Sequence, residues 1–244
     1  MRTKKVKVWA HRGASADYVE NTLPAFAAAI ALGVDGVELD VQLSLDGQAV
    51  VAHDENLQRL AGKDVMINSQ SWSQLKKINI AANRGGRERM PLLKEVLELL
   101  NPTNILVNIE LKNALLTYPD LEQTVVDLVS EQAMTDRVIY STFNTESVVR
   151  LSRLVDPGRC ALLYAYLLTR PVWLSRILGI RILHPHYKVL KIPGYSAFCQ
   201  RHGIKIHTWT VNKEQDILRM LRIKPNAIIT DHPELVFKLM RERP

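Results

Sequence analysis

The chain has 244 residues, with 32 Lys and Arg against 25 Asp and Glu, so its formal net charge is +7 at pH 7. Hydrophobic residues make up 47% of the chain and charged residues 23%, while Gly and Pro number 11 each. This composition excludes a disordered, collagen-like or low-complexity protein and indicates a globular protein with a packed core.

The cysteines and the apolar stretches bear on the cellular compartment. Cys160 and Cys199 are too few and too far apart for a disulfide framework or a CxxC metal site, and we interpret them as reduced thiols. The longest uncharged apolar stretches, residues 25–34 and 160–168, are well short of the roughly 18 residues that a membrane span needs. The apolar N-terminal stretch is interrupted by Lys7 and is too short for a signal peptide. We therefore expect a cytoplasmic protein without a membrane span.

The positive surplus suits a phosphate-bearing substrate or an acidic surface. We interpret it as spread over the chain, because no run of five or more like charges occurs. A basic stripe with interleaved aromatic residues is also absent from the sequence, so no nucleic-acid partner is expected.

Strand-like and helix-like segments alternate along the chain. Apolar residues with 3.6-residue spacing predict helices within 23–30, 96–100, 121–129 and 217–221. Thr22, Asn144 and Asn212 are predicted N-caps. Short β-branched runs predict nine strands, at residues 6–11, 36–43, 49–53, 105–111, 137–143, 160–165, 181–186, 205–211 and 227–231. The alternation is typical of a β/α fold.

The second and third predicted strands are an exception, because only residues 44–48 separate them and a parallel crossover needs a dozen or more. We expect an antiparallel hairpin with Asp46-Gly47 as a two-residue type I′ turn, which would place Asp40 opposite His53. Eight strands remain. They predict a TIM-type (β/α)8 barrel that forms a single domain over residues 1–244.

From about residue 55 to residue 90 the alternation lapses. Turn-forming and charged residues surround one short helical stretch at 72–78, which predicts an insertion over the barrel mouth. Two interpretations stay open: the insertion shapes access to the mouth, or it is a surface loop without a role in function.

Polar residues gather where predicted strands end, which in a β/α barrel is the usual place for catalytic groups. His11-Arg12-Gly13 follows the first strand and offers a titratable imidazole and a planar set of donors for phosphate. Glu38 and Asp40 are two residues apart on one strand and therefore share a face. Two carboxylates that close repel each other unless a cation binds, and oxygen ligands suit Mg²⁺, Ca²⁺ or Mn²⁺.

Two further segments are predicted to reach the same mouth. The hairpin brings His53 beside Asp40, which favours a functional role for this histidine. Asn108, Glu110 and Lys112 share a face at the end of the next barrel strand by the period of two. Burying so many charges without partners is costly, so we expect a functional site.

These motifs resemble the ordered motif set of the glycerophosphodiester phosphodiesterase family. The resemblance runs from residue 8 to about residue 232, and five short motifs in the right order make it specific. It rests on His11-Arg12-Gly13 with Glu20-Asn21-Thr22, on Glu38-x-Asp40, on His53-Asp54, on Ile109-Glu110-Leu111-Lys112 and on Trp209-Thr210-Val211-Asn212.

The resemblance implies a β/α-barrel hydrolase that uses a divalent cation to convert glycerophosphodiesters to glycerol 3-phosphate and an alcohol, as small cytosolic bacterial members do. It implies that Glu38, Asp40 and Glu110 are the metal ligands and that His11 and His53 are the acid/base pair. Arg12 and Lys112 would bind the phosphate. By analogy His11 is the base that activates the glycerol 2-hydroxyl, giving a cyclic phosphate, and His53 is the acid that protonates the leaving alcohol.

Other positions match the family less closely. Phe143 follows a Ser-Thr pair where the family commonly has Ser-Ser and is a candidate contact for the glycerol or the leaving group. Trp209 can stack on the substrate, although a tryptophan on an interior strand more often belongs to the core. Glu20 is expected to orient Arg12 or His11, and Asp231 to cap the last helix.

Three alternative functions stay open at this stage. A related barrel with the same residues acts on lysophospholipids or sphingomyelin as a lysophospholipase D-like or sphingomyelinase D-like enzyme, which needs an apolar channel. A phosphate-binding barrel without activity would be expected to lose a residue of the catalytic or metal-binding set, and none is lost. A nucleic-acid-binding protein would need the basic stripe that the sequence lacks.

Overall fold

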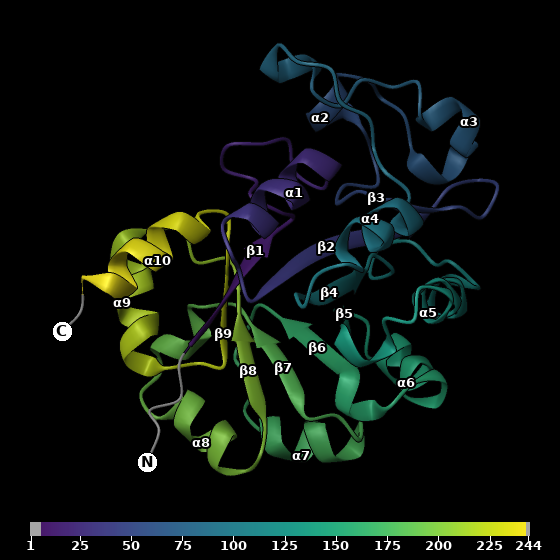
Figure 1. Cartoon of the computed structure of the whole chain (residues 1–244). Coiled ribbons are helices and arrows are strands. Elements are labelled where there is room, and N and C mark those ends of the chain that lie inside the picture. Colours follow the sequence, from purple (N-terminus) through teal and green to yellow (C-terminus); the bar gives the residue numbers. More distant parts are fainter. Residues whose placement is uncertain (1–5, 243–244) are drawn as a thin grey trace.

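Eight parallel strands close into a barrel in the computed structural model, as the sequence predicts (Figure 1). Strand β1 pairs with both β2 and β9, and this double pairing closes the sheet. The barrel strands are β1 (Lys7–His11), β2 (Gly36–Leu43), β4 (Leu106–Leu111), β5 (Val138–Thr142), β6 (Cys160–Tyr164), β7 (Ile182–Pro185), β8 (Lys205–Thr208) and β9 (Ala227–Thr230). The structure describes residues 6–242, so residues 1–5 and 243–244 of the expected domain, including the start of the N-terminal stretch, lie outside it.

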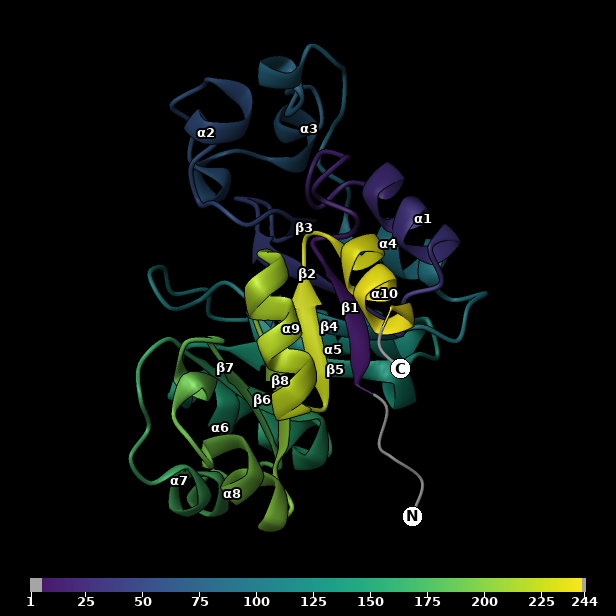
Figure 2. The same cartoon turned by 90° about the vertical axis from the view of Figure 1, so that its left-hand side faces the viewer.

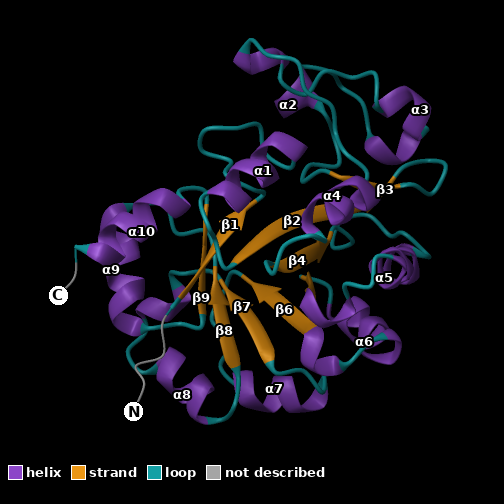
Figure 3. Ribbon diagram, in the orientation of Figure 1, coloured by secondary structure: helices purple, strands orange, loops and turns teal. Residues whose placement is uncertain are grey.

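Helices surround the barrel and cover its outer surface (Figures 1 and 3). They are α1 (Leu23–Ala31), α4 (Leu93–Leu100), α5 (Leu121–Glu131), α6 (Thr145–Leu154), α7 (Pro171–Ile177), α8 (Tyr195–Arg201), α9 (Glu214–Ile223) and α10 (Pro233–Arg241). The main hydrophobic core lies between the strands and these helices. A smaller cluster fills the barrel interior and consists of Trp9, Ile139, Ala161, Ile182, Ala227 and Ile229.

Two of the three predicted N-caps are confirmed. The Thr22 side chain accepts from the backbone N–H of Ala25, and Asn144 accepts from two backbone N–H groups in the first turn of α6. The prediction for Asn212 is wrong. Helix α9 has Lys213 at its N-cap position without a side-chain cap, because the Asn212 side chain is committed to the residues after β9 instead.

The predicted hairpin forms, but its register differs by one residue from the expected one. Strand β3 (Ala49–Val51) runs antiparallel to β2, with Gln42 opposite Val50. The loop has three residues rather than two: the Ser44 N–H donates to the Gln48 carbonyl, and Gly47 has a φ of 74°. A turn closed by a left-handed glycine, rather than a type I′ turn, sets this register.

The shifted register changes the partner of Asp40. The Ala52 N–H donates to the Asp40 carbonyl at 3.0 Å, so Ala52, and not His53, lies opposite Asp40. Strand β3 ends at Val51, and His53 follows in the irregular segment beyond it. His53 therefore reaches the barrel mouth from a loop.

The insertion after β3 has its own small hydrophobic cluster. It contains α2 (Gln58–Ala61), α3 (Trp72–Leu75) and short 3₁₀ turns at Ile67–Ser69 and Ala82–Arg84. The predicted helical stretch at 72–78 is confirmed in its first turn only. Figure 1 shows α2 and α3 beyond β3 and α4, apart from the other helices. The cluster beneath them consists of Val50, Ala52, Leu57, Ala61, Ile67, Leu75, Ile80 and Met90.

Two further expectations concern the membrane and the thiols. Among residues 6–242, no helix combines the length and the apolar character that a bilayer crossing requires.

Both cysteines are buried free thiols, and burial raises the pKa of Cys160 to about 12 and that of Cys199 to about 11.

One glycine position tests the packing of the barrel interior. A Cβ at Gly36 would lie 2.8 Å from the indole ring of Trp9, which is fully buried and packs against the ring of His207. We expect Gly36→Ala to lower the free energy of unfolding by about 1–3 kcal/mol, because the interior cannot expand locally. Denaturant titration measures this change. Gly86→Ala is the matched control, since its Cβ would meet Ala81 at an ordinary 3.6 Å; equal losses in both variants would contradict the packing argument.

Candidate active site

Three buried carboxylates converge at the carboxyl ends of neighbouring strands. Glu38 and Asp40 lie on β2 and Glu110 on β4, and the sheet register places Asp40 beside Glu110. One oxygen from each carboxylate lies within 4.8 Å of the others. The structure thus brings together the three residues that the sequence predicts as metal ligands.

The three carboxylates differ in their electrostatic surroundings. Burial raises the pKa of Glu38 well above its usual range, and the charges of Asp40 and Glu110 raise it further. Burial also raises the pKa of Asp40, but Arg12 and Lys112 outweigh that effect and hold it at about 2. For Glu110, burial raises the pKa and the charge of Lys112 opposes the rise. The cluster therefore carries like charges that the protein compensates only in part.

A hard divalent cation fits this arrangement. Asp40 Oδ1 is buried and has no hydrogen-bond partner in the structure. A cavity of about 20 Å³ lies against His11, Glu38 and Glu110, which is room for an ion or one water molecule. An all-carboxylate set of oxygen donors is the kind that Mg²⁺, Ca²⁺ and Mn²⁺ prefer.

Arg12 and Lys112 face the same cluster from two loops. Arg12 Nε lies 3.2 Å from Asp40 Oδ2, and Lys112 Nζ lies 2.9 Å from Glu110 Oε1 and 3.8 Å from Asp40 Oδ1. Asn21 donates to Asp40 Oδ2 at 2.9 Å. Both predicted phosphate-binding cations thus lie at the mouth, where in this structure they balance the carboxylates.

His11, at the end of β1, is held by a carboxylate from the last strand of the barrel. Its Nδ1 lies 2.6 Å from Asp231 Oδ1, and its Nε2 lies 3.9 Å from Glu38 Oε2. Asp231 also accepts from Ser15 and Asn212. Burial raises the pKa of Asp231, but the hydrogen bond and charge of His11, together with the hydrogen bonds from Asn212 and Ser15, outweigh it and the pKa falls to about 2. An ionised Asp231 directs Nε2 toward the carboxylate cluster.

The predicted capping role of Asp231 is therefore wrong. Helix α10 has His232 at its N-cap position and no side-chain cap. Asp231 turns toward His11 because β9 pairs with β1 in the closed barrel. The sequence interpretation assigned Asp231 a role outside the site. Its position at the end of the last barrel strand could have indicated that it lies at the barrel mouth.

His53 is held by its neighbour in sequence. Its Nδ1 lies 2.6 Å from Asp54 Oδ1, and the other oxygen of Asp54 accepts from Arg59 Nε at 2.6 Å. Arg59 belongs to helix α2, so the insertion contributes directly to the surroundings of His53. Arg59 lies in a stretch of the sequence without periodicity, so no sequence signal marks it as a residue of the site.

A chain of ion pairs connects the insertion to the carboxylate cluster. Glu20 accepts two hydrogen bonds from Arg59, at 2.7 and 2.9 Å, and one from Arg12 Nη1 at 2.9 Å. Arg12 in turn lies against Asp40. Glu20 thus contacts Arg12, one of the two residues that it was expected to orient.

Aromatic side chains form another part of the mouth. The rings of Phe143 and Trp209 meet edge to face with centroids 5.5 Å apart, and His186 packs on the same Trp209 ring at 5.2 Å. Trp209 Nε1 donates to the His184 carbonyl, and its ring lies against the small cavity beside the carboxylates. The two predicted substrate contacts therefore lie side by side at the mouth.

The sequence and the structure both match a known family. The sequence pattern of the glycerophosphoryl diester phosphodiesterase family covers residues 11–235. A glycerophosphodiester phosphodiesterase from Caldanaerobacter subterraneus subsp. tengcongensis is 36% identical, over 98% of this chain and 99% of its own. The structure of a glycerophosphodiester phosphodiesterase from Thermotoga maritima superposes with a TM-score of 0.78 at 31% identity, covering 98% of this chain and 100% of that one. The human lysophospholipase D GDPD1 is 26% identical, over 91% of this chain and 82% of its own.

The fold and the cluster of carboxylates and histidines define a phosphodiesterase of the β/α-barrel class. The chain belongs to the glycerophosphoryl diester phosphodiesterase family, and the expected family, barrel fold and enzyme class are confirmed.

The fit of a divalent cation is open to test without any activity measurement. Added Mg²⁺, Ca²⁺ or Mn²⁺ should raise the Tm of metal-stripped protein by roughly 5–10 °C at a hundredfold excess over Kd, because the ion binds only the folded site. Glu38→Gln should remove the shift, whereas Glu98→Gln, an exposed carboxylate on α4, should keep it. Thermal unfolding followed by circular dichroism measures both. A wild-type protein that no ion stabilises would contradict the cation site.

Proposed function

We propose that the protein hydrolyses glycerophosphodiesters to sn-glycerol 3-phosphate and an alcohol, with Mg²⁺, Ca²⁺ or Mn²⁺ bound by Glu38, Asp40 and Glu110. The observation that carries this proposal is the convergence of three carboxylates and a carboxylate-paired His11 at one barrel mouth. Family membership and the full-length relatives that bear this enzyme's name support the substrate class.

Each charged residue has a role in binding the diester. A cation held by the three carboxylates supplies Lewis-acid charge for the phosphoryl oxygens. Arg12 and Lys112 donate hydrogen bonds to the remaining non-bridging oxygens, and their ion pairs with the carboxylates hold them at the mouth before substrate arrives. Phe143 and Trp209 contact the carbon skeleton of the glycerol or of the leaving group.

The two histidines divide the proton transfers. His11 accepts the proton of the glycerol 2-hydroxyl as that oxygen attacks phosphorus, and His53 donates a proton to the departing alcohol. Reversed roles then let water open the cyclic phosphate. The exposure of the side chains supports this assignment, since 16% of His11 is exposed and 33% of His53. The more open position suits an acid that serves leaving groups of different size.

A lysophospholipase D-type reaction is the second candidate. Support comes from the human relative that carries this name and from the aromatic pair of Phe143 and Trp209, of which Trp209 lines the small cavity beside Glu38 and Glu110. The same metal-binding carboxylates and histidines would serve both reactions, so only a comparison of substrates separates them.

The function is tested with purified protein and four substrates: glycerophosphocholine, glycerophosphoethanolamine, glycerophosphoglycerol and a lysophospholipid. Release of sn-glycerol 3-phosphate from the three glycerophosphodiesters, and of lysophosphatidate from the lysophospholipid, is measured with and without chelator. We expect turnover of the three glycerophosphodiesters, loss on chelation and recovery with a divalent cation. A 2-deoxyglycerol analogue should react far more slowly, because it lacks the attacking hydroxyl. Exclusive cleavage of the lysophospholipid would favour the second candidate, and activity after exhaustive chelation would exclude a metal-dependent reaction.

The division of roles between the histidines predicts different responses to the leaving group. His11→Ala and His53→Ala should each lower kcat/KM by about 10²-fold or more on glycerophosphocholine, because each removes a proton-transfer group. A glycerophosphodiester with a nitrophenol leaving group needs no acid, so it should restore activity to His53→Ala but not to His11→Ala. Steady-state kinetics on both substrates measures this. Equal losses on both substrates in both variants would refute the assignment.

A further inference from the structure

The positive charge of the chain is concentrated in one segment. Between Asp156 and Glu214, residues 157–213 contain no Asp or Glu and nine Lys or Arg, whereas the other 187 residues carry 23 Lys and Arg against 25 Asp and Glu. The segment therefore has a net charge of +9 and the remainder −2. This corrects the interpretation of a dispersed surplus. The basic residues are spaced too widely to form a run, but they belong to neighbouring parts of the barrel.

The same segment exposes large apolar side chains. On the loop after β6, 86% of Tyr166 and 48% of Leu167 are exposed. On the outer surface of α7, one helical turn apart, 58% of Trp173 and 60% of Ile177 are exposed. Ile192 and Phe198, which follow β7, are also exposed. Exposed apolar groups that gather in this way mark an interaction surface.

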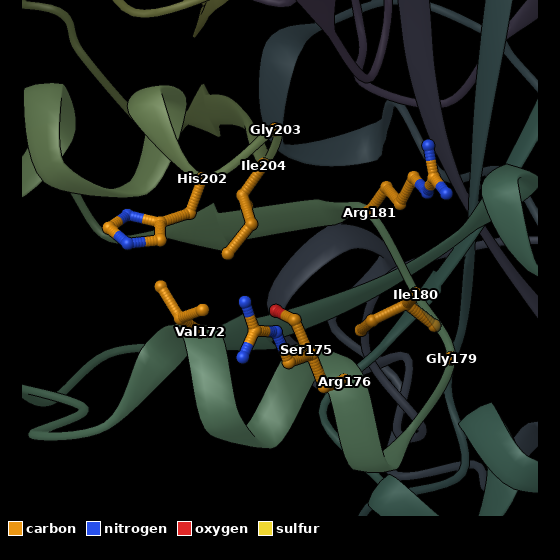
Figure 4. A pocket seen from close by; sticks show the side chains of 9 residues that line it. All are labelled: Val172, Ser175, Arg176, Gly179, Ile180, Arg181, His202, Gly203 and Ile204. Carbon is orange, nitrogen blue, oxygen red and sulfur yellow. The ribbon is translucent and has the colours of Figure 1, made fainter.

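Two separate hollows lie between α7 and α8, which are next to each other in both views (Figures 1 and 2). An apolar groove of about 440 Å³ runs between Leu167 and Pro171 on one side and Ile192 and Phe198 on the other. A second hollow of about 410 Å³ lies toward the amino ends of β7 and β8 and is basic (Figure 4). We call this surface, formed by the loops after β6 and β7 with α7 and α8, the α7–α8 face.

The basic hollow is suited to an anion. Figure 4 shows the Arg176 side chain of α7 and the His202 ring on its rim, while the buried Ser175 hydroxyl also lines it. Ser175 Oγ has no hydrogen-bond partner although only 2% of the residue is exposed. Among the residues described, Arg170, Arg176 and Arg201 form no ion pair with a carboxylate. Their charges are available to an external partner.

We propose that the α7–α8 face binds the surface of an anionic phospholipid bilayer. The apolar side chains of Tyr166, Leu167, Trp173 and Ile177 enter the boundary between headgroups and acyl chains, while the surrounding arginines pair with lipid phosphates. The net positive charge of this face favours an anionic bilayer over a second copy of the chain. A second copy of the chain would bring the same unpaired arginines against each other, which opposes association.

The position of the α7–α8 face relates it to the carboxylate site. The loops after β6 and β7 lie at the carboxyl end of the barrel, the end that also holds Glu38, Asp40 and Glu110. Binding through the loop side of this face therefore brings the rim of the barrel mouth next to the bilayer, whereas the basic hollow lies toward the other end of the barrel. The inference goes beyond the proposed function, and the binding measurement does not depend on turnover.

The test uses the full chain and vesicles of phosphatidylcholine with or without phosphatidylglycerol, separated by flotation at low salt. We expect binding to the anionic vesicles only and release by added NaCl. Trp173→Ala with Ile177→Ala should weaken binding about tenfold or more, because the apolar contact is lost. The matched control is Leu32→Ala with Leu45→Ala, two residues that are 41% and 67% exposed elsewhere on the barrel.

A second pair of variants tests the charge. Arg170→Glu with Arg176→Glu should weaken binding to anionic vesicles by at least tenfold, whereas Lys63→Glu with Lys94→Glu, exposed and with the same change in net charge, should weaken it much less. Turnover of soluble glycerophosphocholine checks that every variant is folded. Three outcomes would overturn the proposal: no binding to anionic vesicles, equal losses in test and control variants, or binding to soluble polyglutamate without binding to vesicles. Dimerisation that Trp173→Ala with Ile177→Ala abolishes would assign the face to a second copy instead.

Discussion

The mutual repulsion of Glu38, Asp40 and Glu110 is the constraint on which the rest of the mouth depends. Three buried carboxylates within 4.8 Å of one another are costly unless positive charge lies close by. Arg12 supplies part of that charge, and its placement requires an unusual backbone: its φ is 56°, and Gly13 lies so close to α1 that a Cβ would be 2.6 Å from the Ala25 backbone. The loop after β1 thus accepts strain in order to place Arg12 against the carboxylates.

The two histidines at this mouth are oriented by carboxylates of different origin. His11 depends on Asp231, which is 220 residues away in sequence and arrives only when β9 closes the barrel against β1. His53 depends on its neighbour Asp54 and on Arg59 from the insertion. A defect in barrel closure would therefore disturb His11 first, and a defect in the insertion would disturb His53 first.

What the sequence could predict follows from the range of the interactions involved. The shared face of Glu38 and Asp40 follows from strand alternation, and the closed eight-strand order follows from the β/α rhythm. The hairpin register was not accessible in this way, because one residue more in the loop around Gly47 moves the partner of Asp40 from His53 to Ala52. The partners of Asp231 and Arg59 were also not predictable from the sequence. The contact of Asp231 with His11 joins the two ends of the chain, and Arg59 lies in a stretch without periodicity.

The closed order of the strands also places the insertion and the α7–α8 face on opposite sides of the mouth. Around the barrel the order is β1, β2, β4, β5, β6, β7, β8 and β9, so β7 lies four positions from β2 in either direction. The insertion follows the β2–β3 hairpin, and Figure 1 shows α2 and α3 at one end of the view with α7 and α8 at the other. Its small core holds α2 in place, and the Arg59 guanidinium can then bridge Glu20 and Asp54. A bilayer bound at the α7–α8 face would therefore leave the insertion, and with it the surroundings of His53, unobstructed on the opposite rim.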